Sequence, residues 1–594
     1  MKSFLLILMM LGLNALLAQS SLVWSNPPTT SNQLNAVNVF DSSTVWCFGE
    51  AGTMIYTTDG GASWEIYYSQ ITEDITDCYF ITDSTGFISC SNGKIFKTAD
   101  RCYTWQEIES GTVSKLIQID FIDNKTGVCL TDDSELLLTT DGGINWVNKR
   151  FSSKENIAAI TLVSPNLIIA VGAKETIGYS LDLGDSWSIN QSESNFNLTS
   201  LDSTPDGKVV ACGDSGLVLT SENFGKTWLR QIVGMKRDLY HVSSNGNSLF
   251  YIVGYHSILP TSTDGGRTWL NKFTGSITDL KAIDYNGNFG CAVGNSGTIT
   301  YSKDGGQIYR YVVNHTNATI KNLYNVKTTD TNTAFVIGYN GALLKTTDYG
   351  KSWNKKSSRG AIEFKGISVI KNKFYWLVGN GGEIRFSSDS GNVFRAQKSN
   401  THFDLNDVYF ADSLNGWIVG DRGTILKTNN SGKSWINSFL KFKRNINCIT
   451  FSNNGLWAVG DSGLFLTSMD KGINWKKQTL TSSDNLNQIV FQGKIGMIVG
   501  DNSTFFVSQD AGLNWEKMVL DFSEDFNGID FCDEKNGWIV GSNGLVLYTD
   551  SGGLNWIRVN SRSRNDLYKI SCYDQYSLFI VGTNGTLLKL KREY

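Results

Sequence analysis

The chain has 594 residues, 12% of them aromatic and 18% charged, with 59 glycines against 5 prolines, a composition typical of short strands joined by tight turns. This length exceeds what one hydrophobic core can organise, so at least two domains are expected. The formal net charge of −4 excludes a strongly basic protein that binds nucleic acid or anionic membranes through its overall field.

The first 18 residues have the features of a secretory signal peptide. Lys2 gives a positive start, an apolar run covers residues 4–17, and Ala18 is a small residue suited to cleavage. The run is shorter than a membrane span requires, and no later stretch reaches 18 apolar residues. We therefore expect residues 1–18 to be removed. The mature protein is expected to be periplasmic or secreted, without a transmembrane segment.

A large aromatic residue recurs along the rest of the chain at intervals of 40 or 41 residues, with one interval of 44. Such a fixed period indicates a repeat architecture with one supersecondary unit per repeat. The recurring residues are Trp24, Trp64, Trp105, Trp146, Trp187, Trp228, Trp269, Tyr309, Trp353, Phe394, Trp435, Trp475, Trp515 and Trp556.

The clearest repeat spans residues 406–440. Its pattern predicts short strands at 407–410, 416–419 and 424–428, and Trp435 opens a fourth. Four antiparallel strands in one such repeat form the blade of a β-propeller. First strands are expected to begin near residues 34, 75, 117, 157, 198, 239, 280, 322, 363, 406, 446, 486, 527 and 567.

The turn before seven of the recurring aromatic residues follows the pattern Ser/Thr-x-Asp-x-Gly-x-Ser/Thr/Asn-Trp, as in STDGGRTW at 262–269. The Asp is expected to accept hydrogen bonds from its own turn, and the Gly to supply a positive φ. Imperfect copies, such as Asn430 in the Asp slot, favour a structural turn over a catalytic group. The aspartates assigned to this structural role are Asp59, Asp100, Asp141, Asp182, Asp264, Asp304, Asp348, Asp389, Asp470 and Asp510.

This turn is the Asp box of BNR repeats, which occur in sialidases, sortilin-type receptors and tandem-propeller xyloglucanases. The run Gly-Trp-Ile-Val-Gly-x-x-Gly at 416–423 and 537–544 more closely resembles the Ycf48 family of photosystem II assembly factors and its bacterial relatives. The resemblance covers nearly all of the mature chain. It implies an all-β propeller and, by analogy with the family, a role in assembling membrane complexes.

Fourteen repeats divide into two tandem seven-bladed propellers, because propellers usually close with four to eight blades. We place the first propeller in residues 19–305 and the second in 306–594. The strand at Trp24 has no strand before it, and the C-terminal repeat lacks a fourth strand. We expect the Trp24 strand to close the first ring and the Tyr309 strand to close the second. The alternative pairs the Trp24 strand with the C-terminal repeat.

Ten cysteines in an exported chain would allow disulfides. They are scattered over eight repeats without paired spacing. Four lie in or just after first strands (Cys78, Cys448, Cys532 and Cys572), and most of the others lie in second strands. We therefore expect small buried apolar residues and no disulfide.

The sequence contains no recognisable catalytic or metal-binding motif. Its four histidines form no metal-like pair, and no cofactor is expected. Glycoside hydrolysis needs two carboxylates across a cleft, and repeats of near-minimal length leave little chain to build one. Five carboxylates recur at one turn position between second and third strands and are interpreted as turn chemistry: Glu50, Asp214, Asp421, Asp461 and Asp501.

The loops that enter first strands should surround one mouth of each channel, together with the turns between second and third strands. In the second ring this mouth should carry Arg422, Lys443, Arg444, Arg562 and Arg564. Arg444 and Arg564 occupy nearly equivalent positions in blades three apart, so they should face each other across the channel. One interpretation is solvated loop charge; the other is a site for an anion or an acidic peptide.

The expected function is that of an exported, non-enzymatic scaffold for protein interaction or assembly, as the resemblance to Ycf48 implies. Its partner would be a protein, such as an acidic peptide or a membrane-complex subunit, with a glycan as a further option and no nucleic acid. One alternative is an Asp-box glycoside hydrolase or glycan-binding module. Another is a surface component of a bacterial secretion or adhesion system.

Overall fold

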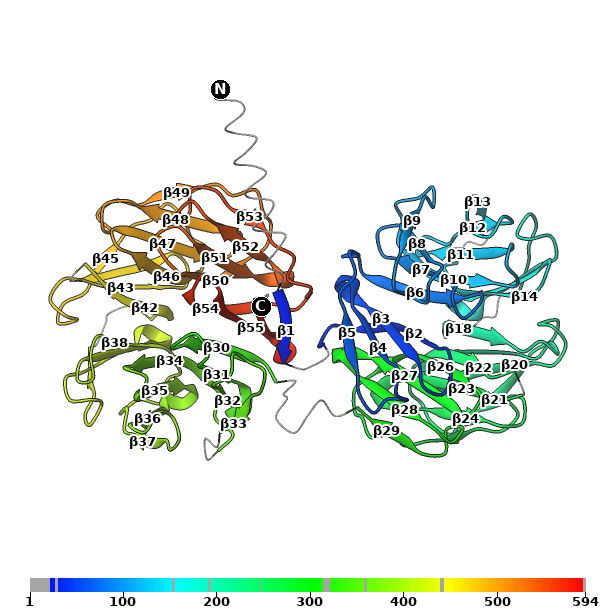
Figure 1. Cartoon of the computed structure of the whole chain (residues 1–594), viewed down its shortest axis with the longest axis horizontal. Helices are drawn as coiled ribbons and strands as arrows, with labels where there is room; N and C mark the ends of the chain where they lie inside the picture. Colours follow the sequence, from blue (N-terminus) through cyan, green and yellow to red (C-terminus); the bar gives the residue numbers. More distant parts are fainter. Residues whose placement is uncertain are drawn as a thin grey trace, which may run out of the picture. The chain divides into compact units, whose positions relative to one another are not determined.

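The computed structural model describes residues 22–26, 30–151, 155–190, 194–246, 248–312, 321–356, 360–438, 443–453 and 455–590. Within these residues the chain forms fourteen four-stranded antiparallel sheets and otherwise only short 3-10 turns (Figure 1). The expected all-β fold is confirmed. Across the described ranges, no helix combines the length and apolar character that membrane crossing requires. The expected signal peptide, residues 1–18, lies outside them.

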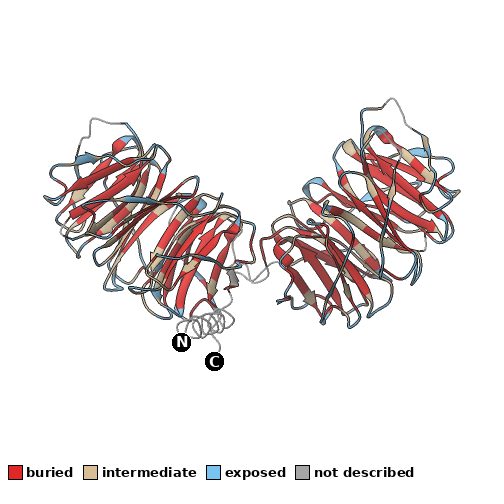
Figure 2. Ribbon diagram, turned by 90° about the horizontal axis from the view of Figure 1, so that it is seen from above, coloured by how far each residue is buried: buried red, intermediate tan, exposed pale blue. Residues whose placement is uncertain are grey.

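Each sheet is one blade. The repeat at 406–440 becomes β38 (Leu405–Phe410), β39 (Gly416–Gly420), β40 (Ile425–Thr428) and β41 (Ile436–Asn437), paired in that order. All five residues of β39 are buried because both faces of a blade pack against neighbouring blades. Figure 2 shows this burial along the strands, with exposed residues in turns and at outer edges.

The innermost strand of each blade packs beside that of the next, and these contacts form two closed cycles of seven. The inner strands of the first ring are β2 (Leu34–Val39), β6 (Ile75–Phe80), β10 (Leu116–Phe121), β14 (Ile157–Ser164), β18 (Leu198–Ser203), β22 (Leu239–Ser244) and β26 (Leu280–Asn286). Those of the second ring are β30 (Leu323–Thr328), β34 (Phe364–Ile370), β38, β42 (Ile446–Ser452), β46 (Leu486–Gln492), β50 (Phe526–Phe531) and β54 (Leu567–Asp574).

The rings close differently from the preferred expectation. β29 (Tyr309–Tyr311) pairs with β28 (Ile299–Ser302) in its own repeat, and β1 (Leu22–Asn26) pairs antiparallel with the last strand, β56 (Leu587–Leu590). The prediction that the Trp24 strand closes the first ring is therefore wrong, and the alternative pairing is found. β29 follows β28 after a short turn, and such local pairing costs little chain entropy. The compact units accordingly divide after residues 28 and 313, and not after 305.

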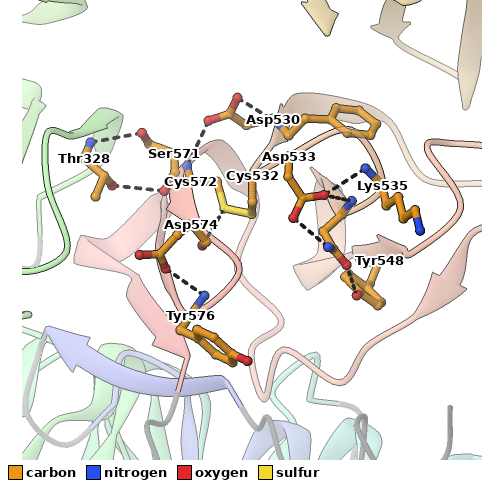
Figure 3. Close-up of a disulfide and its surroundings, with 12 residues drawn as sticks. Thr328, Asp530, Cys532, Asp533, Lys535, Tyr548, Ser571, Cys572, Asp574 and Tyr576 are labelled. Carbon is orange, nitrogen blue, oxygen red and sulfur yellow. Dashed lines mark hydrogen bonds between the residues drawn. A yellow bond between two sulfur atoms is a disulfide. The ribbon is translucent and has the colours of Figure 1, made fainter. Parts of the chain in front are cut away.

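A disulfide joins two neighbouring blades of the second ring. Cys532 directly follows β50 and Cys572 lies in β54, with their Cα atoms 5.1 Å apart (Figure 3). The prediction that no cysteines pair is wrong here, because a separation of one repeat places equivalent positions of adjacent inner strands side by side. The other eight cysteines are free.

Candidate functional site

The Asp-box aspartates sit in closed turns before the outer strands. Asp264 accepts hydrogen bonds from the Ser262 hydroxyl (2.8 Å), the Thr268 amide (2.9 Å) and the Thr268 hydroxyl (2.6 Å). All ten sequence-identified aspartates accept from the hydroxyl two residues earlier and from the amide four residues later. Hydrogen bonds from Ser63 and Thr57 lower the pKa of Asp59 to about 2.

The carboxylates between second and third strands also take part in hydrogen bonds within the fold. Asp214 accepts the Asn197 amide (3.0 Å), and Asp421 accepts the side-chain amide of Asn406 (2.9 Å). Glu50 accepts the backbone amide of Gln33. Asp461 and Asp501 accept the side-chain amides of Asn447 and Asn487. These contacts tie each turn to the start of the inner strand of its own blade.

Three of the predicted basic residues lie on two loops that meet between neighbouring blades of the second ring, and the Arg422 guanidinium lies over the ring of Phe403, 5.2 Å from its centroid. The Arg422 amide donates to the Asn445 side chain (3.1 Å), which fixes the turn Asp421–Gly423 against the loop that carries Lys443 and Arg444. The guanidinium of Arg444 donates to the Ser462 carbonyl (2.9 Å). All three basic side chains are exposed. They form the basic cluster, defined as Arg422, Lys443 and Arg444.

Arg562 and Arg564 lie in the loop before β54, three blades after the loop of Arg444. Arg562 is half-buried and its amide donates to Asn560 (2.9 Å), whereas Arg564 is exposed. The repeat places both loops at the same mouth of the ring, because each loop enters an inner strand. That Arg444 and Arg564 face each other across the channel stays a prediction.

A second feature, which the sequence reasoning missed, lies inside the first ring. A cavity of about 300 Å³ is lined by inner-strand residues that include Asp77, Asp120, Asp202, Asp284 and His241. The four aspartates are the third or fifth residues of their strands, so an alternation read along each inner strand could have found them. The cavity appears only when the ring closes and brings seven strands together.

Each of these carboxylates serves the neighbouring blade. Asp284 accepts the Val39 amide (2.7 Å), and Asp202 accepts the Ser244 amide (2.6 Å). Asp77 and Asp120 accept the amides of Ile119 and Leu162 in the same manner. An inner strand has no further strand on its channel side, so the carboxylates satisfy amides that would otherwise lack a partner.

Burial shifts the protonation of these groups. It raises the pKa of Asp77, Asp120 and Asp284 to about 7 and that of Asp202 to about 6, and neighbouring carboxylates add to the first three shifts. Burial lowers the pKa of His241 to about 4. The cavity therefore gains negative charge as the pH rises through neutrality.

The channel of the second ring has a different balance of charge. Asp407 and Asp530 accept the amides of Ile449 (3.0 Å) and Cys572 (2.9 Å), the second of which is visible in Figure 3. Lys569 donates to Gln488 (2.8 Å) and partly offsets the upward pKa shift that burial imposes on Asp407. Lys327, and to a smaller extent Lys569, does the same for the pKa of Asp530. This ring thus supplies its own ammonium group.

Comparison with solved structures identifies whole-chain likenesses of low sequence identity. An ancestral GH74 enzyme aligns over 96% of this chain and 99% of its own, with 13% identity and a TM-score of 0.71. The GH74 enzyme of Niastella koreensis aligns over 95% and 98%, with 13% identity and a TM-score of 0.65. PorZ, a surface component of the type-IX secretion system of Porphyromonas gingivalis, aligns over 95% and 86%, with 10% identity and a TM-score of 0.68. At such identities the likeness establishes the fold alone.

No curated protein matches the sequence. A family model does match, and it is described as "Photosynthesis system II assembly factor YCF48". It covers residues 231–357, 392–484 and 475–564, which together make up half of the chain. The matched segments extend over both rings. With its Asp boxes and its Gly-Trp-Ile-Val-Gly runs, the chain belongs to the Ycf48 family of BNR-repeat β-propellers.

Proposed function

We propose that this protein is an exported, non-enzymatic scaffold whose second ring binds an acidic segment of a partner protein. The observation that carries the proposal is the hydrogen bond from the Arg422 backbone amide to the Asn445 side chain, which joins the two loops that carry the basic cluster at one mouth. Guanidinium and ammonium groups bind carboxylates through charge-assisted hydrogen bonds, and Arg does so with two parallel bonds. Membership of the Ycf48 family supports an assembly role.

A non-enzymatic role is supported by how the carboxylates are used. Those in the Asp boxes and in the turns at the mouth accept hydrogen bonds from neighbouring groups, which fixes them in closed turns. The carboxylates in the channels of both rings satisfy inner-strand amides. Each of these carboxylates therefore has a structural task, and none of them needs to be explained as a member of a catalytic acid–base pair.

An extracytoplasmic location is supported by the disulfide between Cys532 and Cys572. Disulfides persist in oxidising compartments such as the periplasm and the cell exterior, and they are rare in a reducing cytosol. The location is consistent with the signal peptide expected at residues 1–18.

The proposal is tested by measuring how tightly the full chain binds a fluorescent oligoglutamate peptide. Replacing Arg444 and Arg564 together by Glu should weaken binding by about tenfold or more at low salt, because attraction becomes repulsion. The loss should shrink as salt is raised, since exposed charges are screened. Circular dichroism and the melting temperature should stay close to the wild-type values.

The matched control reverses two charges of the same ring away from the mouth. Lys476 and Lys477 are exposed on the outer strand β45 (Lys476–Gln478), and K476E/K477E should leave peptide binding almost unchanged. Equal losses in the two double variants would mean that net charge alone governs binding, and the proposed site would then be rejected.

A further inference from the structure

The cavity of the first ring holds more negative charge than its structural task requires. Each of its four aspartates accepts an amide of the next blade through one carboxylate oxygen, at distances of 2.6 to 3.0 Å. The second oxygen of Asp202 and of Asp284 accepts an amide of its own strand, at 2.7 and 2.8 Å. An ionised carboxylate can accept about four hydrogen bonds, so each group keeps capacity for another donor. These groups line a cavity of about 300 Å³, which is large enough for a side chain to enter.

The second ring shows how the same architecture balances such charge. Its seventh inner strand, β54, carries Lys569 as the third residue, and that ammonium group donates to Gln488 across the channel. The third residue of the seventh inner strand of the first ring, β26, is Ala282, which lines the cavity. The first ring therefore has carboxylates at its cavity wall but neither the ammonium group nor the side-chain volume that Lys569 supplies.

His241 gives a second, independent indication that the cavity takes a ligand. Its ring lines the cavity, and its Nδ1 atom is enclosed without a hydrogen-bond partner among the described residues. An enclosed polar atom without a partner is costly in a folded protein, and native structures rarely retain one. A hydrogen-bond donor that enters the cavity would satisfy the carboxylates directly, and Nδ1 once the imidazole ring turns toward the cavity.

The arrangement of the carboxylates favours an organic cation over a metal ion. Asp77, Asp120, Asp202 and Asp284 come from four different strands around the ring, and each is tied to the cavity wall by an amide of the next blade. Divalent ions need several oxygens that converge to within about 2.0–2.6 Å. An alkyl chain that ends in several N–H donors can instead reach separate acceptors on the wall of such a cavity.

We propose that the first-ring cavity binds the ammonium or guanidinium group of a lysine or arginine side chain that a partner polypeptide inserts into the channel. The aspartates accept the charged hydrogen bonds, and His241 forms part of the wall beside them. The incoming side chain occupies the volume that Ala282 leaves open. This site lies in the other ring from the basic cluster and does not depend on it.

The probe is the tripeptide acetyl-Gly-Lys-Gly-amide, titrated into the full chain by calorimetry. We expect saturable binding with one site per chain, and no binding of the same peptide with norleucine in place of lysine. The variant D202N/D284N keeps an acceptor oxygen for the neighbouring amides, and its affinity should fall by about tenfold or more. The matched variant D407N/D530N, in the second ring, should bind like the wild type.

The variant A282K keeps the test decisive if D202N/D284N fails to fold. It supplies an internal ammonium group at the position of Lys569, so it should abolish peptide binding and raise the melting temperature.

The titratable side chains that line the cavity are the four aspartates, His241, Cys78 and Tyr79. Because the carboxyl pKa values lie at about 6 to 7, binding should weaken when the pH is lowered from about 8 to about 5.5.

Four results would overturn the proposal. The first three are equal binding of the lysine and norleucine peptides, wild-type binding of the lysine peptide by A282K, and binding of Ca²⁺ or Mn²⁺ where the peptide does not bind. The fourth comes from spermidine as a further probe. If it binds and the tripeptide does not, the cavity is a site for free polyamines, and the claim of an inserted side chain is wrong.

Discussion

At the scale of single residues, one side-chain type has two opposite environments. The Asp-box aspartates are held ionised by several donors in their turns, as the lowered pKa of Asp59 shows. The cavity aspartates have their pKa raised by burial. The local sequence pattern identified the first group because its partners lie within four residues. It missed the second because the burial of Asp120 or Asp284 arises from strands on other blades.

These shifts predict how stability depends on pH. The cavity aspartates have folded pKa values of about 6 to 7, above the ordinary 3.8, so their stabilising contribution is complete near pH 4 and is lost as the pH rises through 7. His241 acts in the opposite sense, since its pKa falls from 6.5 to about 4 and its contribution is lost on acidification. The contribution of the four aspartates to the pH dependence outweighs that of the single histidine. Calorimetric melting should therefore show a higher midpoint for the first ring at about pH 5.5 than at about pH 8.

The variant D202N/D284N provides the control for this prediction. Asn does not titrate, so the variant should lose roughly half of the stability difference between the two pH values. An unchanged pH dependence in the variant would show that other groups cause it.

At the scale of elements, the strand that completes a blade decides how each ring closes. Strand type and repeat length could be predicted from the sequence, because alternation and turn residues recur in every repeat. The partner of the Trp24 strand could not be predicted, because the exposed sheet edges of the two rings offer the same backbone donors and acceptors. The structure pairs β1 with β56 and leaves β29 within its own repeat. The disulfide was missed for a similar reason, since it depends on the register between two neighbouring blades.

This topology predicts the effect of removing β1. A mature chain that starts at Thr30 should keep a stable first ring and have a second ring with a lower melting midpoint, because the edge of β56 loses its partner. The exposed edge should also increase aggregation. The measurement is two-transition calorimetry of the shortened and the full mature chains. A shortened chain that destabilises only the first ring would contradict the observed pairing.

At the scale of the whole molecule, the two rings share one architecture and differ in their polar interiors. The all-β fold and the count of fourteen repeats followed from the period of the chain. The surplus of carboxylates around Asp202 and Asp284 could not be predicted from the period, and neither could the internal Lys569 of the second ring. The period leaves the polar residues of inner strands free to vary. Two rings with different interiors favour two distinct binding sites on one scaffold.

The most direct test of the scaffold account is photocrosslinking in the native cell. A benzophenone amino acid in place of Lys443 lies in the basic cluster, whereas the same group in place of Lys476 lies on an outer strand of the same ring. We predict a discrete crosslinked partner from position 443, with an acidic segment at the crosslink, and none from position 476. No crosslink from position 443, or the same products from both positions, would contradict the claim that the protein works by binding a partner at this mouth.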